Sequence, residues 1–133
     1  MATVVVDTCV VSFLFKGDSR AQLYRPHLAD NLLVISFMTL AELYRWPLES
    51  GWGLNRRATL EAHLNDFVVY PFNRALCQRW AEITHQGASK GKPVPMADAW
   101  TAATAFLYEI PLVSNNRRHF ERIEGLTLLS EAS

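Results

Sequence analysis

The chain has 133 residues, of which 50% are hydrophobic, 20% are charged and 11% are aromatic. This length predicts a single domain spanning residues 1–133, and the composition excludes a disordered, collagen-like or low-complexity chain. Thirteen Lys and Arg residues balance thirteen Asp and Glu residues, so the formal net charge is zero. No global positive field exists to hold nucleic acid without selectivity, and any such binding must come from a local patch.

The cysteine content and the apolar runs predict a cytoplasmic protein without a membrane span. Cys9 and Cys77 have neither the spacing of a zinc site nor the number of a disulfide framework. The longest nearly apolar run, residues 32–41, contains Ser36 and Thr39 and falls short of the roughly 20 residues that a membrane helix needs. The amino-terminal segment lacks a basic region, so we expect no secretory signal.

Strand-like and helix-like segments alternate along the chain. Apolar, often β-branched runs predict strands at residues 3–6, 32–35, 67–71, 111–114 and 126–129. Helical patterns predict helices at residues 9–15, 19–29, 55–66, 75–86 and 96–108. Between the second and third of these, a further helix is expected through residues 41–46, with Ser36 and Thr39 as its candidate caps. We expect Pro47 to disturb this further helix and residues 87–95, which contain two Gly and two Pro, to form a loop. The order predicts an α/β fold, a three-layer α/β/α sandwich with a mostly parallel five-stranded sheet.

Three acidic residues lie in apolar surroundings instead of in polar turns. Asp7 follows three valines, Glu42 lies within the largely apolar residues 37–43, and Asp98 lies within residues 95–100. A carboxylate in such surroundings is unfavourable unless it is hydrogen-bonded, paired with a cation or bound to a metal. Each of the three therefore needs a structural or functional explanation.

The predicted fold brings these three carboxylates to one edge of the sheet. Asp7 ends a strand, and Glu42 and Asp98 fall in the expected first turns of helices that follow the sheet's carboxyl edge. Three carboxylates at one place repel one another unless a divalent cation neutralises them. A cluster of oxygen ligands suits Mg²⁺ or Mn²⁺, whereas Zn²⁺ prefers His or Cys.

Each acid also has a purely structural interpretation. Asp7 could cap the first helix, Glu42 could close a capping box with Thr39, and Asp98 could face the positive end of a helix dipole. Cys9 could be imagined as a nucleophile, but its apolar neighbours favour a buried, inert thiol. The joint occurrence of the three acids favours a functional site.

A polar segment follows the fourth predicted strand. Ser114 is followed by two amides, of which Asn116 is the second, and then by Arg117 and Arg118. Amides at a strand end can hold metal-bound water, and arginines can contact phosphates. The alternative is a solvated turn and helix face.

In order along the chain, four segments resemble the PIN-domain ribonucleases, and among them the VapC toxins of VapBC toxin–antitoxin pairs. These segments are Val-Val-Val-Asp7-Thr8, Ser36-Phe-Met-Thr-Leu-Ala-Glu42-Leu, Met-Ala-Asp98-Ala-Trp-Thr-Ala-Ala-Thr and Leu-Val-Ser114-Asn-Asn116-Arg-Arg-His-Phe120. The resemblance covers nearly the whole chain. A match of all four segments in the same order is far more specific than a match of any one of them.

The resemblance implies roles for individual residues. Asp7, Glu42 and Asp98 would form the catalytic acidic triad, with Asp7 and Asp98 as the direct Mg²⁺ ligands. Thr8 and Ser114 would support the site, and Arg117 and Arg118 are the candidates for RNA binding. One departure matters, because many PIN domains carry a fourth acid where this chain has Asn116. An asparagine can orient water or bind metal, but it cannot neutralise a second cation, so we hypothesise that a second ion arrives only with the RNA.

The same resemblance implies a reaction and partners. We expect an endoribonuclease in which Mg²⁺, or Mn²⁺ in its place, polarises a phosphodiester while Glu42 orients the attacking water. Its products would be 5′-phosphate and 3′-hydroxyl ends, and its substrate a structured RNA such as a tRNA. The family implies a VapB-type antitoxin and a homodimer. Apolar candidates for these surfaces, not separable from core residues by sequence, are Leu14, Phe15, Leu43, Tyr44 and Trp46.

Two other functional classes remain open at this point. A phosphoacceptor signalling domain shares the α/β sandwich, but it normally has an adjacent acid pair after the first strand and a late lysine. Here Asp7 stands alone and no lysine follows Lys92. A binding-only PIN module without catalysis is the other alternative, and Asn116 keeps it open although the triad is intact.

Overall fold

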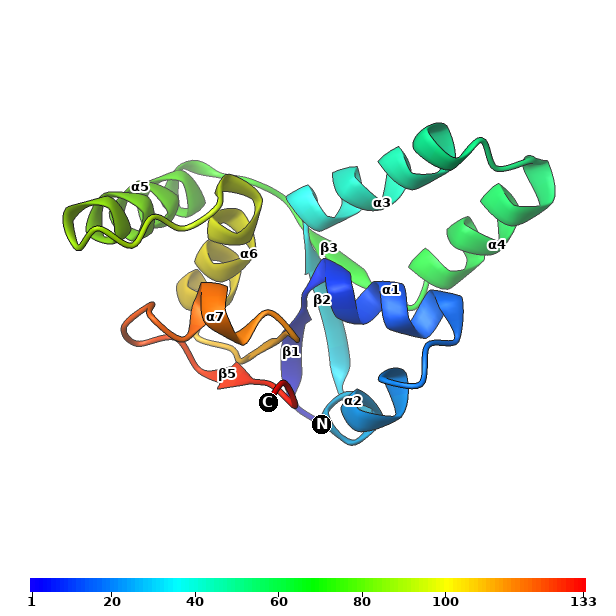
Figure 1. The fold of residues 1–133 in the computed structure, drawn as a ribbon, viewed down its shortest axis with the longest axis horizontal. Coiled ribbons are helices and arrows are strands. Elements are labelled where there is room, and N and C mark those ends of the chain that lie inside the picture. Colours follow the sequence, from blue (N-terminus) through cyan, green and yellow to red (C-terminus); the bar gives the residue numbers. More distant parts are fainter.

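The computed structural model describes all residues from Met1 to Ser133, and in it five strands and seven helices alternate along the chain (Figure 1). In chain order they are β1 (Thr3–Val6), α1 (Thr8–Lys16), α2 (Ala21–Leu28), β2 (Leu32–Ser36), α3 (Phe37–Ser50), α4 (Leu54–Leu64), β3 (Val68–Tyr70), α5 (Arg74–Ser89), α6 (Met96–Leu107), β4 (Leu112–Val113), α7 (Arg117–Phe120) and β5 (Leu128–Leu129). All five predicted strands are present, and β3, β4 and β5 are shorter than the predicted ranges.

The five strands form one sheet in the order β3-β2-β1-β4-β5, and every neighbouring pair is parallel. Val5 of the central strand pairs with Val34 on one side and with Leu112 on the other. The chain therefore builds outward from β1 through β2 to β3, and later adds β4 and β5 on the opposite side. Such a reversal leaves a crevice at the carboxyl ends of the two strands where it occurs, here β1 and β4.

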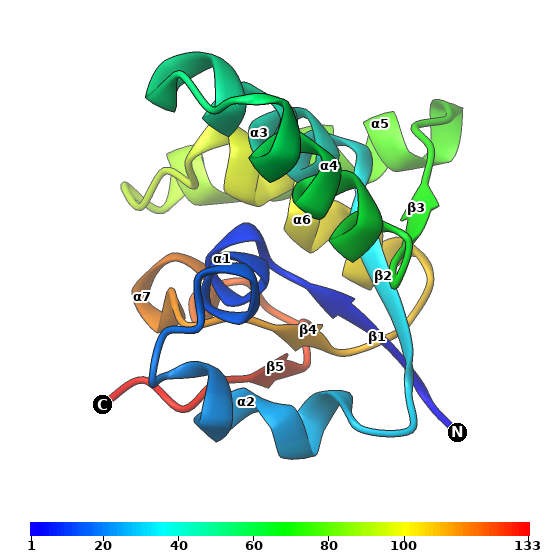
Figure 2. The same cartoon turned by 90° about the vertical axis from the view of Figure 1, so that its right-hand side faces the viewer.

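Helices cover both faces of the sheet, which confirms the three-layer α/β/α sandwich (Figures 1 and 2). Side chains alternate between the faces along β1, because successive residues of a strand point to opposite sides. Val4 and Val6 join a core built with α1 to α4, whereas Val5 joins a second core built with α5, α6 and α7. Both cores contain residues that are fully buried.

Helix α6 lies close to the sheet because its buried face carries only small side chains. These are Ala99, Thr101, Ala102, Ala103, Thr104 and Ala105. Pro95, which precedes the helix, fixes the chain direction at its start. Asp98 consequently occupies the first turn of α6, as predicted from the sequence.

Helices α3 and α5 both continue past the points where the sequence predicted an interruption. Pro47 does not end α3, which continues to Ser50 and closes at Gly51, whose φ of 63° is in the left-handed region. Gly87 does not end α5, which continues to Ser89. The reason for Gly87 is steric, since a Cβ at this position would lie 2.9 Å from the Lys92 carbonyl oxygen. Glycine there lets the returning loop pass close to the helix.

Of the two candidate caps in the sequence, Ser36 is the one that begins helix α3. The buried Ser36 hydroxyl accepts a hydrogen bond from the Thr39 amide at 3.1 Å and lies 3.3 Å from the Thr101 hydroxyl of α6. Glu42 therefore falls in the second turn of α3 and not in the first. The capping box of Thr39 and Glu42 is wrong for the same reason, since Ser36 already supplies the cap.

Replacing Ser36 by Ala should destabilise the fold. Loss of a helix cap costs about 1 kcal/mol, which corresponds to a fall of about 3–5 °C in the melting temperature of a domain of this size. Thermal unfolding followed by circular dichroism measures the change. Ser50→Ala is the matched control, because Ser50 is exposed at the last position of the same helix. An unchanged melting temperature for Ser36→Ala would contradict the capping role.

Candidate active site

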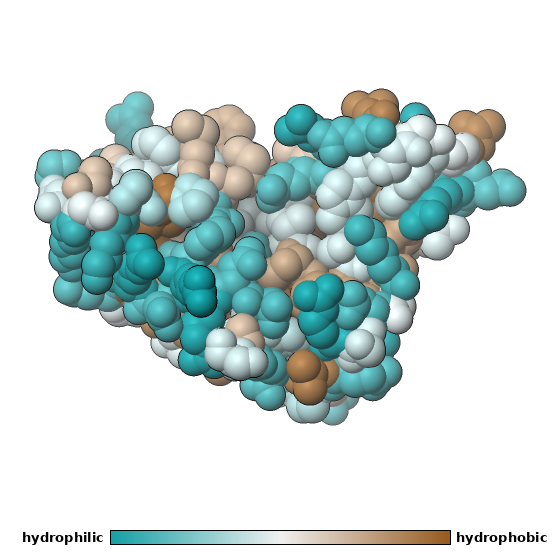
Figure 3. Space-filling view, in the orientation of Figure 1, coloured by the Kyte–Doolittle hydropathy of each residue, from teal (hydrophilic) through white to brown (hydrophobic).

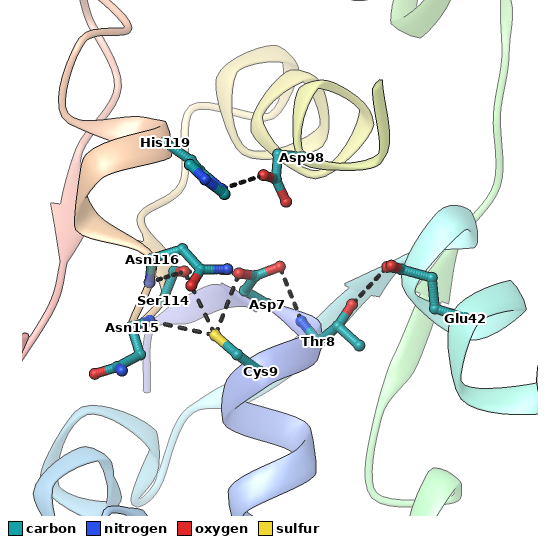
Figure 4. Close-up of polar contacts among 9 residues, drawn as sticks. All are labelled: Asp7, Thr8, Cys9, Glu42, Asp98, Ser114, Asn115, Asn116 and His119. Carbon is teal, nitrogen blue, oxygen red and sulfur yellow. Dashed lines mark hydrogen bonds and ion pairs between the residues drawn. The ribbon is translucent and has the colours of Figure 1, made fainter. Parts of the chain in front are cut away.

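Asp7 stands at the centre of the site, directly after β1 (Figure 4). Its carboxylate accepts hydrogen bonds from the Thr8 amide at 2.9 Å, from the Ser114 hydroxyl at 2.6 Å and from the Cys9 thiol at 3.3 Å. Asp7 thus caps α1, as one sequence interpretation proposed, and is also tied to the segment after β4. Only 3% of the residue is exposed.

The Asp7 carboxylate has no cationic side chain to balance its charge. Burial raises its pKa, the hydrogen bond from Ser114 lowers it, and the nearby Asp98 raises it further, with a raised pKa as the net result. No Lys, Arg or His side chain forms an ion pair with Asp7. Ionised Asp7 is therefore unfavourable in the folded protein, and a bound cation would relieve that penalty.

Glu42 reaches the site from α3 and is held there by Thr8. The Thr8 hydroxyl donates a hydrogen bond to Glu42 Oε1 at 2.8 Å and lies 3.0 Å from the Thr39 hydroxyl. Burial raises the pKa of Glu42, the hydrogen bond from Thr8 lowers it, and the charge of Asp7 raises it. One hydroxyl group therefore connects the helix that follows β1 with the helix that follows β2.

Asp98 enters from α6, above Asp7 in the view of Figure 4, and meets His119 of α7. Asp98 Oδ2 lies 2.6 Å from His119 Nδ1. Burial raises the pKa of Asp98, the nearby His119 lowers it, and the charge of Glu42 raises it. His119 was missed from the sequence, where its only signal was a position in the polar segment after the fourth strand.

The segment after β4 closes the site beside Asp7. Ser114 is fully buried, and its hydroxyl also accepts a hydrogen bond from the Asn116 amide at 3.0 Å. The Asn115 amide donates to Cys9 Sγ at 3.4 Å. Figure 4 shows the Asn116 side chain next to the Asp7 carboxylate. The structure therefore brings Asp7, Ser114 and Asn116 together, as the sequence predicted.

The two arginines of α7 have different surroundings. The Arg117 guanidinium donates to the carbonyl oxygens of Ala132 at 3.1 Å and Ser130 at 3.0 Å, so it holds the carboxyl-terminal segment. Arg118 is exposed and forms no ion pair. A cavity of about 450 Å³ lies here, lined by Asn115, Asn116, Arg117, Arg118, His119, Glu121, Ala132 and Ser133.

Cys9 contributes a neutral hydrogen-bond donor and no nucleophile. Burial and the adjacent Asp7 raise the pKa of its thiol to about 12. A thiol with so high a pKa stays protonated at neutral pH and is unreactive. This agrees with the inert thiol expected from the sequence.

The donor set of the site fits a hard divalent cation. Asp7, Glu42 and Asp98 offer carboxylate oxygens and raise one another's pKa values by their charges. No group of three or more His, Cys, Asp or Glu side chains is close enough to hold one ion. Mg²⁺ usually takes one or two carboxylates and completes its shell with water and substrate phosphate, so Asp7 and Asp98 would suffice as its protein ligands.

The fold and this acidic strand-end site define the class of protein. The PIN domain family model matches residues 4–126, so the chain belongs to the PIN domain family. Among curated relatives, the tRNA(fMet)-specific endonuclease VapC of Shigella flexneri is 28% identical over 126 residues, which are 95% of this chain and 96% of the relative. Ribonuclease VapC1 of Haemophilus influenzae strain R2866 is 28% identical over 127 residues, covering 92% of each chain.

Solved structures of VapBC complexes have the same fold. VapBC2 from Rickettsia felis, bound to a promoter DNA fragment, aligns with a TM-score of 0.85 at 22% identity and covers 96% of this chain and 98% of that one. DNA-bound VapBC from Salmonella typhimurium aligns with a TM-score of 0.80 at 25% identity and covers 98% of both chains. The predicted resemblance to PIN-domain ribonucleases of the VapC type is confirmed, and a phosphoacceptor signalling domain is excluded.

None of the seven helices combines the length and the apolar character that crossing a membrane requires. The cytoplasmic location stays a prediction from the sequence.

Proposed function

We propose that this protein is the toxin of a type II toxin–antitoxin pair and acts as a metal-dependent endoribonuclease on structured RNA. One observation carries the proposal. Asp7, Glu42 and Asp98 reach the same strand-end site from β1, α3 and α6, and burial together with their mutual repulsion raises the pKa of each. Membership of the PIN domain family and the VapC ribonucleases among its relatives support the same conclusion.

Asp7 and Asp98 would hold Mg²⁺, and Mn²⁺ can take its place because both accept oxygen ligands. When bound, the ion supplies a Lewis acid that polarises the phosphodiester and lowers the pKa of a water molecule. Asn116 contributes an amide where a fourth acid would add charge, which favours one tightly bound ion in the absence of RNA. Calorimetry that finds two tight Mn²⁺ sites in the RNA-free protein would contradict this stoichiometry.

Neighbouring groups fix the orientation of the Asp7 and Glu42 carboxylates. Ser114 and the Thr8 amide hold Asp7 in one orientation. The Thr8 hydroxyl occupies Oε1 of Glu42 and leaves Oε2 free to orient the attacking water and accept its proton. Attack of this water on phosphorus, in line with the P–O3′ bond, would form a new P–O bond as the P–O3′ bond breaks, and protonation of the departing 3′ oxygen by solvent would leave a 5′-phosphate and a 3′-hydroxyl end.

We propose a tRNA as the substrate. The zero net charge of the chain argues against indiscriminate capture of RNA, so recognition must depend on shape and on local charge. Exposed Arg118 and the cavity beside Asn116 provide such a local contact for a phosphate. Two of the VapC relatives, from Shigella flexneri and Salmonella typhimurium, are named as tRNA(fMet)-specific endonucleases.

A VapB-type antitoxin is the proposed partner, because the structural neighbours include VapBC complexes. Leu43 is fully buried, whereas Tyr44 and Leu48 of the same helix are 44% and 72% exposed. Leu54 at the start of α4 is 85% exposed, and Figure 3 shows hydrophobic surface at the outer edge of the α3 and α4 lobe. We propose that the antitoxin covers this lobe, and that the free protein is a homodimer.

Of the other apolar candidates, Leu14, Phe15 and Trp46 are partly buried and pack against the first core. Their contribution to a partner surface is therefore smaller than that of the exposed residues on α3 and α4.

The direct test is cleavage of total RNA, including the tRNA pool, by purified antitoxin-free protein. We expect discrete fragments in Mg²⁺ or Mn²⁺, none in EDTA, and recovery of cleavage when metal is restored. The fragments should carry 5′-phosphate ends. Fragments that end in 2′,3′-cyclic phosphate would require a mechanism without metal and overturn the proposal. Intact RNA under every condition, from protein shown to be folded, would establish the binding-only PIN module instead.

A further inference from the structure

His119 is the only hydrogen-bonding partner of the Asp98 carboxylate in this structure. Its Nδ1 lies 2.6 Å from Asp98 Oδ2, and no other side chain or backbone group donates to Asp98. The contrast with Asp7 is large, since Asp7 accepts from Thr8, Cys9 and Ser114. The orientation of Asp98 therefore depends on one residue.

The backbone that carries His119 is well fixed. The next residue, Phe120, is fully buried in the second core, and the His119 amide donates to the Asn116 carbonyl at 3.0 Å. Asp98 is fixed in the same way, because the neighbouring Ala99 is fully buried in the same core. Helices α6 and α7, each anchored in the second core, therefore hold the imidazole and the carboxylate in contact.

The contact between His119 and one oxygen of Asp98 sets the direction of the other oxygen. Figure 4 shows one oxygen of the carboxylate at His119 and the other pointing away from the imidazole, toward Asp7. A carboxylate that binds a metal through one oxygen is commonly held by a hydrogen bond to the other, which sets its direction before the ion arrives.

We propose that His119 is a positioning residue of the metal site, which holds Asp98 Oδ2 so that Oδ1 faces the space shared with Asp7. This inference rests on the proposed function, because it takes Asp7 and Asp98 as the metal ligands. Neither a hydrogen bond nor an ion pair joins His119 to Asp7 or Glu42, so its effect on the ion would pass through Asp98.

A role in fold stability would account poorly for this pair. The Asp98 side chain is 16% exposed, but that of His119 is 47% exposed, and an ion pair with one partner open to water contributes little to folding. The effect of removing the imidazole should therefore appear in the affinity for metal and not in the melting temperature.

The experiment is calorimetric titration of Mn²⁺ into the RNA-free protein and three variants. His119→Ala should weaken Mn²⁺ binding by about 10–100-fold, the usual effect of losing a group that orients a metal ligand. His119→Asn should restore most of the affinity, because its amide nitrogen is attached like Nδ1 of the imidazole and can donate to Asp98. His85→Ala is the matched control and should bind like the parent, since His85 is exposed on α5 and has no ion-pair partner.

The outcomes separate this inference from the proposed function. A parent protein that binds no Mn²⁺ would overturn both. Parent and His119→Ala binding Mn²⁺ equally well would overturn only the role of His119. Tighter binding by His119→Ala would also overturn it, because it would show that the imidazole competes with the ion for Asp98. Thermal unfolding of each variant establishes that the proteins compared are folded.

Discussion

Asparagine in place of Asp7 or of Asp98 is expected to reduce the rate of RNA cleavage by about 10³-fold or more. Loss of a group that only supports a metal ligand costs about 10–100-fold, so loss of a ligand itself should exceed that range. The substitution preserves the size of each side chain and removes its charge. Initial rates on one tRNA substrate at saturating Mg²⁺ measure the effect.

The expected loss follows from the separate positions of the two acids. Asp7 reaches the site from the end of β1 and Asp98 from the first turn of α6, and no third carboxylate joins them in a group that could hold one ion. Neither can replace the other, because each is held by its own hydrogen-bond partners. An asparagine offers a neutral oxygen, which binds Mg²⁺ far more weakly than a carboxylate does.

Asp30→Asn is the matched control for these variants. Asp30 is exposed in the turn before β2, at the edge of the sheet opposite the site, and has a φ of 62° that asparagine tolerates. Its cleavage rate should equal that of the parent. If Asp98→Asn cleaved RNA at the rate of the Asp30→Asn control, Asp98 would not be a metal ligand and the site would have to be reassigned.

The acidic residues of the site were predictable because their surroundings in the sequence are local. A carboxylate beside Val6, or inside the apolar start of α6, is conspicuous whatever the fold around it. The strand pattern then places Asp7 at the carboxyl edge, and the helix pattern places Asp98 in a first turn. These inferences need only neighbouring residues.

Other features of the site depend on tertiary contacts, which the sequence does not display. Ser36 and Thr39 were equally good caps for α3, and the choice of Ser36 moved Glu42 from the first turn to the second. Thr8, which donates a hydrogen bond to Glu42, is 34 positions away from it in the chain. His119 stands in a run of charged residues that looks like a solvated helix face, and only the packing of α7 beside α6 brings it to Asp98.

Asp7→Asn should also change the stability of the metal-free protein, and here the variant should gain where it loses in RNA cleavage. The pKa of Asp7 is raised in the folded protein, chiefly by burial. A carboxyl group of this kind favours the folded state fully at pH values below its unfolded pKa, and that contribution is lost as the pH rises through its folded pKa. At neutral pH the ionised carboxylate therefore opposes folding of the metal-free protein. Asp7→Asn removes this charge and keeps an oxygen that can accept from the Thr8 amide.

We accordingly expect the metal-free Asp7→Asn variant to melt about 3–5 °C above the parent at pH 7, which corresponds to about 1 kcal/mol in a domain of this size. The difference should shrink as the pH falls through the raised pKa of folded Asp7, because the parent carboxyl then becomes protonated and neutral. Thermal unfolding in EDTA from pH 7 down through this pKa measures both effects. A variant that melts below the parent at pH 7 would show that the hydrogen bonds to Asp7 outweigh the cost of its buried charge.

Addition of metal should reverse the order of the two proteins. A cation that binds only the folded state stabilises it in proportion to the logarithm of its concentration above the dissociation constant. Mn²⁺ should therefore raise the melting temperature of the parent and leave that of Asp7→Asn nearly unchanged. If Asp7→Asn is more stable without metal but inactive, the carboxylate of Asp7 serves to bind the ion and not to stabilise the fold.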